Sequence, residues 1–155
     1  MDIFDKFLKL LAAFETHNVE YVLIGGYAII LHGFLRATQD IDLFVDPTEG
    51  NVSRVRAAIG ELYSDPSISE ITSGELLKYP VIRYGTEDGF SIDLIARIGE
   101  AFRFSDLQYE TKTIGGVVVR VATPETLYKL KKDTHREIDQ LDLRFLERKI
   151  KDNDD

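Results

Sequence analysis

Two aspartates in an apolar run are the residues of this sequence best placed to do chemistry. Asp40 and Asp42 stand two positions apart in residues 40–46, where acids alternate with apolar side chains. Alternate residues of a strand point to the same face about 6–7 Å apart, so the two carboxylates are expected side by side. Neighbouring carboxylates repel one another unless a cation or a shared proton compensates them, and magnesium is the usual ion beside phosphates. The same spacing is equally typical of an exposed edge strand with solvated acids.

A third aspartate interrupts another apolar segment. Asp93 lies within residues 91–95, Ser-Ile-Asp-Leu-Ile, which predict a central strand where an unpaired acid is costly. If this strand lies beside residues 40–46, three carboxylates can hold two metal ions and align an acceptor oxygen with a triphosphate. Alone, Asp93 would more often be structural, so the metal interpretation depends on all three acids.

A pair of glycines separates a predicted strand from a predicted helix. Gly25 and Gly26 follow the apolar residues 21–24 and precede a helix over 27–32. Glycine lets the backbone approach an anion closely, and the amides of a helix N-terminus favour negative charge. The pair matches neither the P-loop nor the dinucleotide-binding glycine motif, and such a pair is more often a turn. Phosphate binding here therefore depends on the acids nearby.

Taken in order, these segments resemble the nucleotidyltransferase superfamily, whose fold is polymerase-β-like. The matching segments are Gly25-Gly26-Tyr27-Ala28, Leu31-His32-Gly33, Arg36-Ala37-Thr38 and Asp40-Ile41-Asp42-Leu43. In that superfamily a third acid stands on a later strand, and Asp93 occupies the corresponding place. The arginine and threonine before the acidic strand make the chain most similar to the small bacterial AbiEii-type branch, which is linked to toxin–antitoxin systems.

The resemblance implies a reaction at the α-phosphorus of a nucleoside triphosphate such as ATP. An acceptor hydroxyl on a protein, an RNA 3′ end or a small molecule would attack, and pyrophosphate would leave. Asp40, Asp42 and Asp93 would be the catalytic residues and would bind Mg²⁺ or Mn²⁺, with Asp93 able to take the proton of the hydroxyl. Gly25 and Gly26 would present their amides to the triphosphate.

Three further residues are implied in nucleotide binding. Arg36 and Thr38 would contact phosphate or order the loop before the acidic strand, and Lys131 would bind the triphosphate. Each of these three residues is equally typical of an exposed position that does not bind nucleotide. The downstream segment that resembles this branch comprises Pro124-Glu125-Thr126-Leu127, Lys131, Arg136, Asp139 and Asp142. Ile138 stands where that branch commonly has lysine, so one contact to nucleotide or acceptor is missing.

That departure leaves a second interpretation open, in which the pocket only binds. The chain would then be a non-catalytic or regulatory member of the fold, such as an antitoxin component that holds nucleotide or a cognate toxin or antitoxin partner. A third interpretation is an acidic α/β domain without any site. His32, at the end of a predicted helix, is expected to be structural and not a general base.

The elements around these residues predict one α/β (α+β) domain over residues 1–150, followed by an acidic disordered tail at 151–155. The expected fold is that of a nucleotidyltransferase, a small mixed sheet covered by helices with a helical C-terminal segment. Turn-forming residues make 64–74 the expected flexible loop. Thr123 is the predicted N-cap of a helix through 127–132, with Pro124 at its first position. The other predicted elements are helices over 2–16, 27–32 and 49–62 and through residue 150, strands over 21–24 and 40–46, and hairpins joining 81–84 with 90–95 and 109–113 with 117–121.

The composition excludes several classes of function. The 155 residues contain no cysteine, which removes disulfides, thiolate zinc sites and cysteine nucleophiles and agrees with a cytoplasmic location. A net charge of -8 argues against non-specific binding along a nucleic-acid backbone. The longest apolar stretches fall well short of the ~20 residues that a membrane span needs, so no membrane association is expected.

Overall fold

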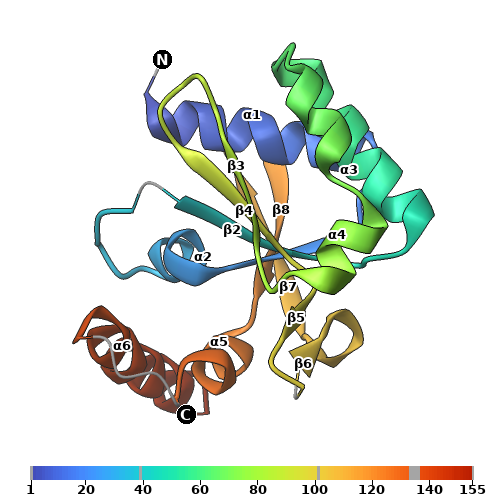
Figure 1. The fold of residues 1–155 in the computed structure, drawn as a ribbon. Coiled ribbons are helices and arrows are strands. Elements are labelled where there is room, and N and C mark those ends of the chain that lie inside the picture. The colour runs from blue at the N-terminus through green and yellow to red at the C-terminus, as the bar shows by residue number, and fades with distance from the viewer. Residues whose placement is uncertain (1, 39, 101, 133–136, 155) are drawn as a thin grey trace.

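The computed structural model describes residues 2–38, 40–100, 102–132 and 137–154, and of residues 137, 138 and 154 only the backbone (Figure 1). Its main sheet has six strands in the order β3-β4-β2-β1-β8-β7, and two short strands, β5 and β6, pair separately. The strands are β1 (Tyr21–Ile24), β2 (Asp40–Val45), β3 (Ile82–Gly85), β4 (Ser91–Ile95), β5 (Arg97–Ile98), β6 (Phe102–Arg103), β7 (Tyr109–Ile114) and β8 (Val117–Ala122). The helices are α1 (Ile3–Thr16), α2 (Gly25–Leu31), α3 (Glu49–Leu62), α4 (Ser73–Lys78), α5 (Pro124–Lys131) and α6 (Glu137–Asp154), with 3-10 turns η1 (Pro66–Glu70) and η2 (Phe104–Asp106).

The sheet is mixed because its central strands run in both directions. β2 pairs with β4 in parallel and with β1 in antiparallel fashion, and β1 pairs with β8 in parallel. The two outer hairpins, β3–β4 and β7–β8, are antiparallel. The predicted small mixed sheet is therefore confirmed, and its parallel β2–β4 pair brings the two acidic segments together.

Helices cover the sheet on both sides. In Figure 1, α1 and α3 lie above the strands and α5 and α6 lie below them. α1 turns Phe7, Leu10, Leu11 and Phe14 inward, the spacing of one helical face, and all four are fully buried. The strands complete the same cluster of buried apolar side chains, for example through Leu43 of β2.

Most predicted elements occur close to their expected bounds, but the segment 64–74 is not an open loop. It contains η1 and the first residues of α4, and its side chains Ile68 and Ile71 are buried. Asp65 accepts a hydrogen bond from the Ser67 backbone N–H, which fixes the start of the 3-10 turn. Turn-forming residues here start short helices, so the prediction of a flexible loop was wrong.

Two other expectations need correction. Gly25 and Gly26 do not form a separate turn, because α2 begins at Gly25 itself. The tail is not disordered as far as the structure describes it, because α6 continues through residues 151–154, and residue 155 lies outside the described part. Within the described ranges, no helix is long and apolar enough to cross a membrane.

Candidate active site

The centre of the site is a pair of aspartates on neighbouring parallel strands. Asp42 of β2 lies directly opposite Asp93 of β4, close enough for their carboxyl groups to share a hydrogen bond. The pKa of Asp42 is raised to about 7, chiefly by burial and then by the charge of Asp93, that hydrogen bond and the charge of Asp40, while Lys131 opposes the rise. Near neutral pH the pair therefore holds a proton part of the time, and a bound cation would replace it.

An arginine that the sequence analysis missed contacts this pair. Arg83 of β3 lies opposite Asp93 in the hairpin register. Its Nε and Nη2 donate to the two carboxylate oxygens of Asp93 at 2.8 and 2.9 Å. Its Nη2 also lies 3.5 Å from Asp40 Oδ2, so Arg83 links the first and third acids. The predicted hairpin could have placed it, because a residue directly across from an acid is its nearest neighbour.

The carboxylates of Asp42 and Asp93 suit a hard divalent ion, although the three aspartates do not converge on one point. Among the described residues, no three acidic or histidine side chains come close enough together to ligate one ion. Asp42 and Asp93 offer carboxylate oxygens in contact, which are the donors that Mg²⁺ and Mn²⁺ prefer. Arg83 lies between Asp93 and Asp40, and its side chain is 60% exposed, so it has space to move aside. Metal ligation by all three aspartates stays a prediction.

The Asp42 carboxylate lies so close to residue 25 that only glycine fits there. Its φ of +72° is a backbone conformation that favours glycine, and a Cβ at this position would lie 2.0 Å from Asp42 Oδ2. Any other residue would push the carboxylate away from Asp93. Gly25 therefore has a steric role at the acid pair, and its amide contact to phosphate stays a prediction.

The loop before β2 packs against the second glycine. A Cβ at Gly26 would lie 3.1 Å from Cβ of Thr38 and 3.4 Å from Cζ of Arg36. Thr38 Oγ1 accepts from the Asp40 backbone N–H at 3.4 Å and donates to the Asp40 carbonyl at 3.3 Å. The two hydrogen bonds of Thr38 hold the start of β2, whereas the ordering role predicted for Arg36 stays a prediction. Contact with phosphate stays a prediction.

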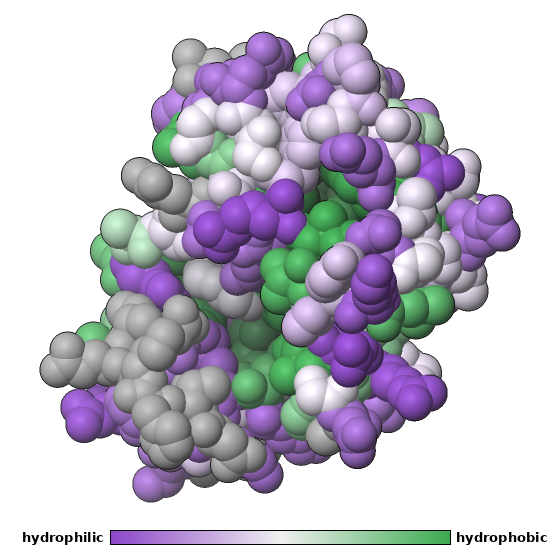
Figure 2. Space-filling model, in the orientation of Figure 1, coloured by the Kyte–Doolittle hydropathy of each residue, from purple (hydrophilic) through white to green (hydrophobic). Residues whose placement is uncertain are grey.

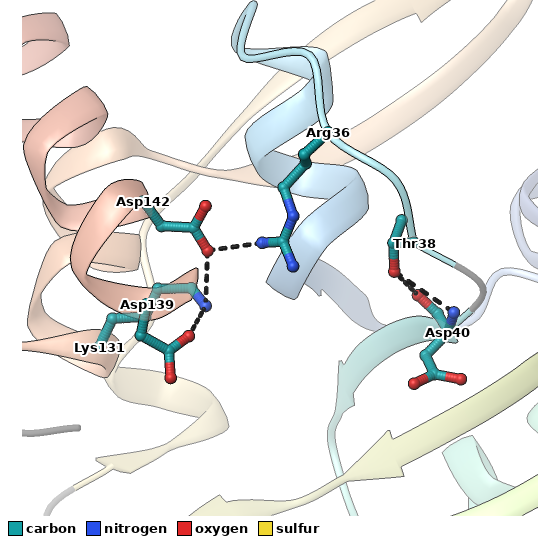
Figure 3. Close-up of polar contacts among 6 residues, drawn as sticks. All are labelled: Arg36, Thr38, Asp40, Lys131, Asp139 and Asp142. Carbon is teal, nitrogen blue, oxygen red and sulfur yellow. Dashed lines mark hydrogen bonds and ion pairs between the residues drawn. The ribbon is translucent and has the colours of Figure 1, made fainter. Parts of the chain in front are cut away.

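Lys131 and Arg36 meet two buried aspartates of α6 (Figure 3). Lys131 Nζ donates to Asp139 at 2.8 Å and lies 3.2 Å from Asp142, to which Arg36 also donates. Both aspartates are fully buried, and buried carboxylates stay ionised only when cations and hydrogen bonds compensate them. Neither Lys131 nor Arg36 is thus a plain surface residue. Arg136 and the side chain of Ile138 lie outside the described residues.

Asp42 and Asp93 face a pocket of about 200 Å³. Four predicted residues line it, namely Gly25, Asp42, Asp93 and Lys131, whereas Asp40, Gly26, Arg36 and Thr38 are not among its described lining residues. Figure 2 shows hydrophobic surface in the central hollow of this face, bordered by hydrophilic side chains. The apolar part of the lining consists of Ile24, Val81, Ile95, Ile98, Leu127 and Leu130.

The buried histidine beside this region is structural, as predicted. His32 Nε2 lies 2.8 Å from the Ala122 carbonyl, and burial lowers the pKa of the imidazole. The side chain thus ties the end of α2 to the end of β8 and lies outside the residues that line the acid pocket.

Comparison with known proteins identifies the architecture. Residues 1–74 match a family described as nucleotidyltransferase of unknown function, DUF6036. The lincomycin-bound crystal structure of the lincosamide antibiotic adenylyltransferase LnuA superposes with a TM-score of 0.61 at 17% identity, over 92% of this chain and 95% of that one. The chain has the nucleotidyltransferase fold. No curated protein sequence matches the chain.

Two other solved structures share this nucleotidyltransferase fold. ANT(2″)-Ia in complex with adenylyl-2″-tobramycin has a TM-score of 0.54 at 18% identity, over 92% of this chain and 86% of that one. An antigenic nucleotidyltransferase-like protein from Paracoccidioides brasiliensis has a TM-score of 0.53 at 16% identity, over 92% and 75%. The predicted fold class is thereby confirmed, and the family match supports the prediction of a nucleotidyltransferase.

The narrower resemblance is not confirmed. The matching family is DUF6036, and nothing in these comparisons points to the AbiEii-type branch or to a toxin–antitoxin role. The family match includes both glycines and the first two acids but ends before Asp93 and Lys131. For those two residues, their position in the pocket is the supporting observation.

Proposed function

We propose that this protein transfers a nucleoside monophosphate from a nucleoside triphosphate to an acceptor hydroxyl and releases pyrophosphate. The observation that carries the proposal is the contact between Asp42 and Asp93, which face one pocket from adjacent parallel strands with Gly25 against them. Asp40, Asp42 and Asp93 would hold Mg²⁺ or Mn²⁺. When bound there, the ion supplies positive charge that offsets the charge developing on the transferred phosphoryl group.

The acid pair would also receive a proton. In the reaction the acceptor oxygen forms a bond to the α-phosphorus, while the bond from that phosphorus to the bridging oxygen breaks and pyrophosphate leaves with the electron pair. The hydroxyl proton passes to the Asp42–Asp93 pair. The pKa of about 7 belongs to Asp42 without metal, and a bound cation would lower it, so the pair would be ionised and able to accept the proton. Asp93, with both oxygens bonded to Arg83, is held in position beside it.

The remaining predicted residues would bind or order the nucleotide. Lys131 lines the pocket with the acids, and its bonds to α6 hold the ammonium group on that wall, where it would attract the triphosphate. Gly25 and Gly26 would offer backbone amides to phosphate oxygens. The apolar lining would take the base or the acceptor, because pockets for small molecules are mostly apolar with a few fixed polar groups.

The relatives of known structure suggest what to test first. The names of two of them describe adenylyl transfer, to a lincosamide antibiotic and to tobramycin. Among protein, RNA and small-molecule acceptors, a small-molecule hydroxyl with ATP as donor is therefore the first combination to assay.

The experiment combines binding with transfer. Thermal shift with each of the four ribonucleoside triphosphates, with Mg²⁺ or Mn²⁺, should raise the melting temperature only when metal and nucleotide are both present. Transfer is then measured with α-labelled triphosphate and a small-molecule extract. Asp42→Asn should abolish both effects, whereas Asp152→Asn, which removes an exposed acid of α6, should change neither. Equal labelling by wild type and Asp42→Asn would refute the proposed site.

A second candidate function is nucleotide or partner binding without transfer. It is favoured by the two hydrogen bonds from Arg83, which already occupy both oxygens of Asp93. A partner would be a protein such as a cognate toxin or antitoxin. Calorimetry would favour this alternative if a purified partner binds tightly and Asp40→Ala and Asp93→Ala leave that affinity unchanged.

A further inference from the structure

A second pocket lies at the carboxyl ends of β2 and β4. It has a volume of about 370 Å³ and combines apolar side chains with two guanidinium groups. We call it the arginine pocket. Its lining includes Arg97 and Arg103, the acid Asp46, and the apolar residues Pro47, Leu77, Ala96 and Phe104.

The two arginines are direct cross-strand neighbours. Arg97 of β5 is paired with Arg103 of β6, and residues paired in this way have Cβ atoms about 4.5–5.5 Å apart with side chains on the same face. Like charges at such positions destabilise a strand pair. Within the described part of the chain, neither guanidinium forms an ion pair, although Asp46 also lines the pocket. The hairpin therefore presents two neighbouring guanidinium groups, with Asp46 as the one acid among the pocket's described lining residues, on a protein of net charge -8.

The apolar side chains of the pocket are also accessible to a ligand. Residue Leu77 is 57% exposed, a large fraction for a leucine, and Phe104 is only partly buried. An aromatic or aliphatic group placed against them would remove apolar surface from water. Charge and apolar surface thus occur together in one concave site, which is the usual composition of a small-molecule pocket.

The arginine pocket is separate from the acid pocket but shares a wall with it. Ile95 and Ile98 line the acid pocket, while Ala96 and Arg97 between them line the arginine pocket. Arg97 follows Asp93 by four residues, which places their backbones at most about 13 Å apart along an extended chain. A ligand here would lie beside the metal and triphosphate site without occupying it.

We propose that the arginine pocket binds a small organic anion, one phosphate, sulfate or carboxylate group carried on an apolar, preferably aromatic, body. The anionic group would accept charge-assisted hydrogen bonds from Arg97 and Arg103, whose planar guanidiniums match such oxygens in a bidentate way. The body would lie against Phe104 and Leu77. Binding requires neither a metal ion nor a nucleoside triphosphate.

The test uses phenyl phosphate with isotope-labelled protein in the presence of a chelator. NMR of the arginine Nε–Hε groups should show saturable shifts of the Arg97 and Arg103 signals. Arg97→Gln and Arg103→Gln should each weaken binding about tenfold or more, because each removes a charge-assisted contact. Arg54→Gln, which removes an exposed arginine of α3, is the matched control and should leave the affinity unchanged. Inorganic phosphate should bind several-fold more weakly, since it lacks the apolar body.

Several outcomes would overturn the proposal. Unmoved Arg97 and Arg103 signals would exclude the site, and an equal loss of affinity in Arg54→Gln would indicate attraction by charge alone. Equal affinity for inorganic and phenyl phosphate would exclude the apolar contact. Both pocket variants should unfold at or above the wild-type melting temperature without ligand, because each relieves a like-charge pair, so a failure to bind cannot be attributed to misfolding. Since metal and triphosphate are absent, the result is independent of the proposed transfer reaction.

Discussion

Replacing Asp42 by asparagine should stabilise the metal-free protein at alkaline pH. In the folded protein the pKa of Asp42 is raised from 3.8 to about 7, chiefly by burial and by the neighbouring Asp93. The folded state thus binds a proton more tightly than the unfolded state does. The contribution of this group to stability is complete below about pH 4 and is lost as the pH rises through 7.

The size of the effect follows from the shift. A rise of the Asp42 pKa from 3.8 to about 7 corresponds to about 4 kcal/mol in the free energy of unfolding if the whole shift contributes. Since the side chain retains some contact with solvent and is coupled to Asp93, we expect about 1–3 kcal/mol. Asparagine cannot ionise, so Asp42→Asn should gain this amount over wild type at pH 8.5, and the gain should vanish near pH 4.

Urea unfolding followed by circular dichroism, from pH 4 to 8.5 with a chelator, measures the difference. Comparing the variant with wild type at each pH cancels the other titrating groups. Addition of Mn²⁺ should then stabilise wild type and not Asp42→Asn, and Asp152→Asn should behave as wild type throughout. A variant less stable than wild type at pH 8.5 without metal, or a difference independent of pH, would refute the account of this pair.

Three other changes test how the site is built. Gly25→Ala should destabilise the protein by about 1–3 kcal/mol and weaken Mn²⁺ binding, because the new Cβ collides with the Asp42 carboxylate at a residue with positive φ. The control Gly60→Ala, at an exposed position of α3, should stabilise the protein by up to about 1 kcal/mol. Urea unfolding measures both changes. Arg83→Gln should raise Mn²⁺ affinity several-fold in an electron paramagnetic resonance titration, because a competing cation is removed, and an unchanged affinity would argue against that competition. Arg36→Gln should destabilise by about 1–3 kcal/mol, because the fully buried Asp142 loses one of its cations, and a loss below about 0.5 kcal/mol would contradict that role.

The sequence predicted the elements whose signals are local. Alternating acids and apolar residues are enough to predict β2, because strand periodicity is visible over six residues. Thr123 and Pro124 are enough to predict the start of α5, where the threonine side chain accepts a hydrogen bond from the Thr126 N–H. The contact of Asp42 with Asp93 was a conditional prediction, since it depended on which strands became neighbours.

The features that sequence reasoning missed depend on distant parts of the chain. Arg83 reaches the acids because the hairpin register sets it opposite Asp93; the hairpin was predicted from the sequence, but its register was not worked out. The β5–β6 pair has two residues in each strand, too few for a periodic signal. Residues 66–70 carry turn formers, but the same residue types also start 3-10 turns, and buried Ile68 decides the outcome.

The parallel pairing of β2 with β4 also determines when in the life of the chain an active site can exist. Parallel neighbours need a long crossover, and here the connection contains α3, η1, α4 and β3. Asp42 can meet Asp93 only after that whole crossover has been made and placed, and Lys131 follows later still. A nascent chain that ends within the family-matching residues 1–74 has both glycines and two acids but no pocket. A partly synthesised chain therefore lacks the proposed site for metal and nucleotide.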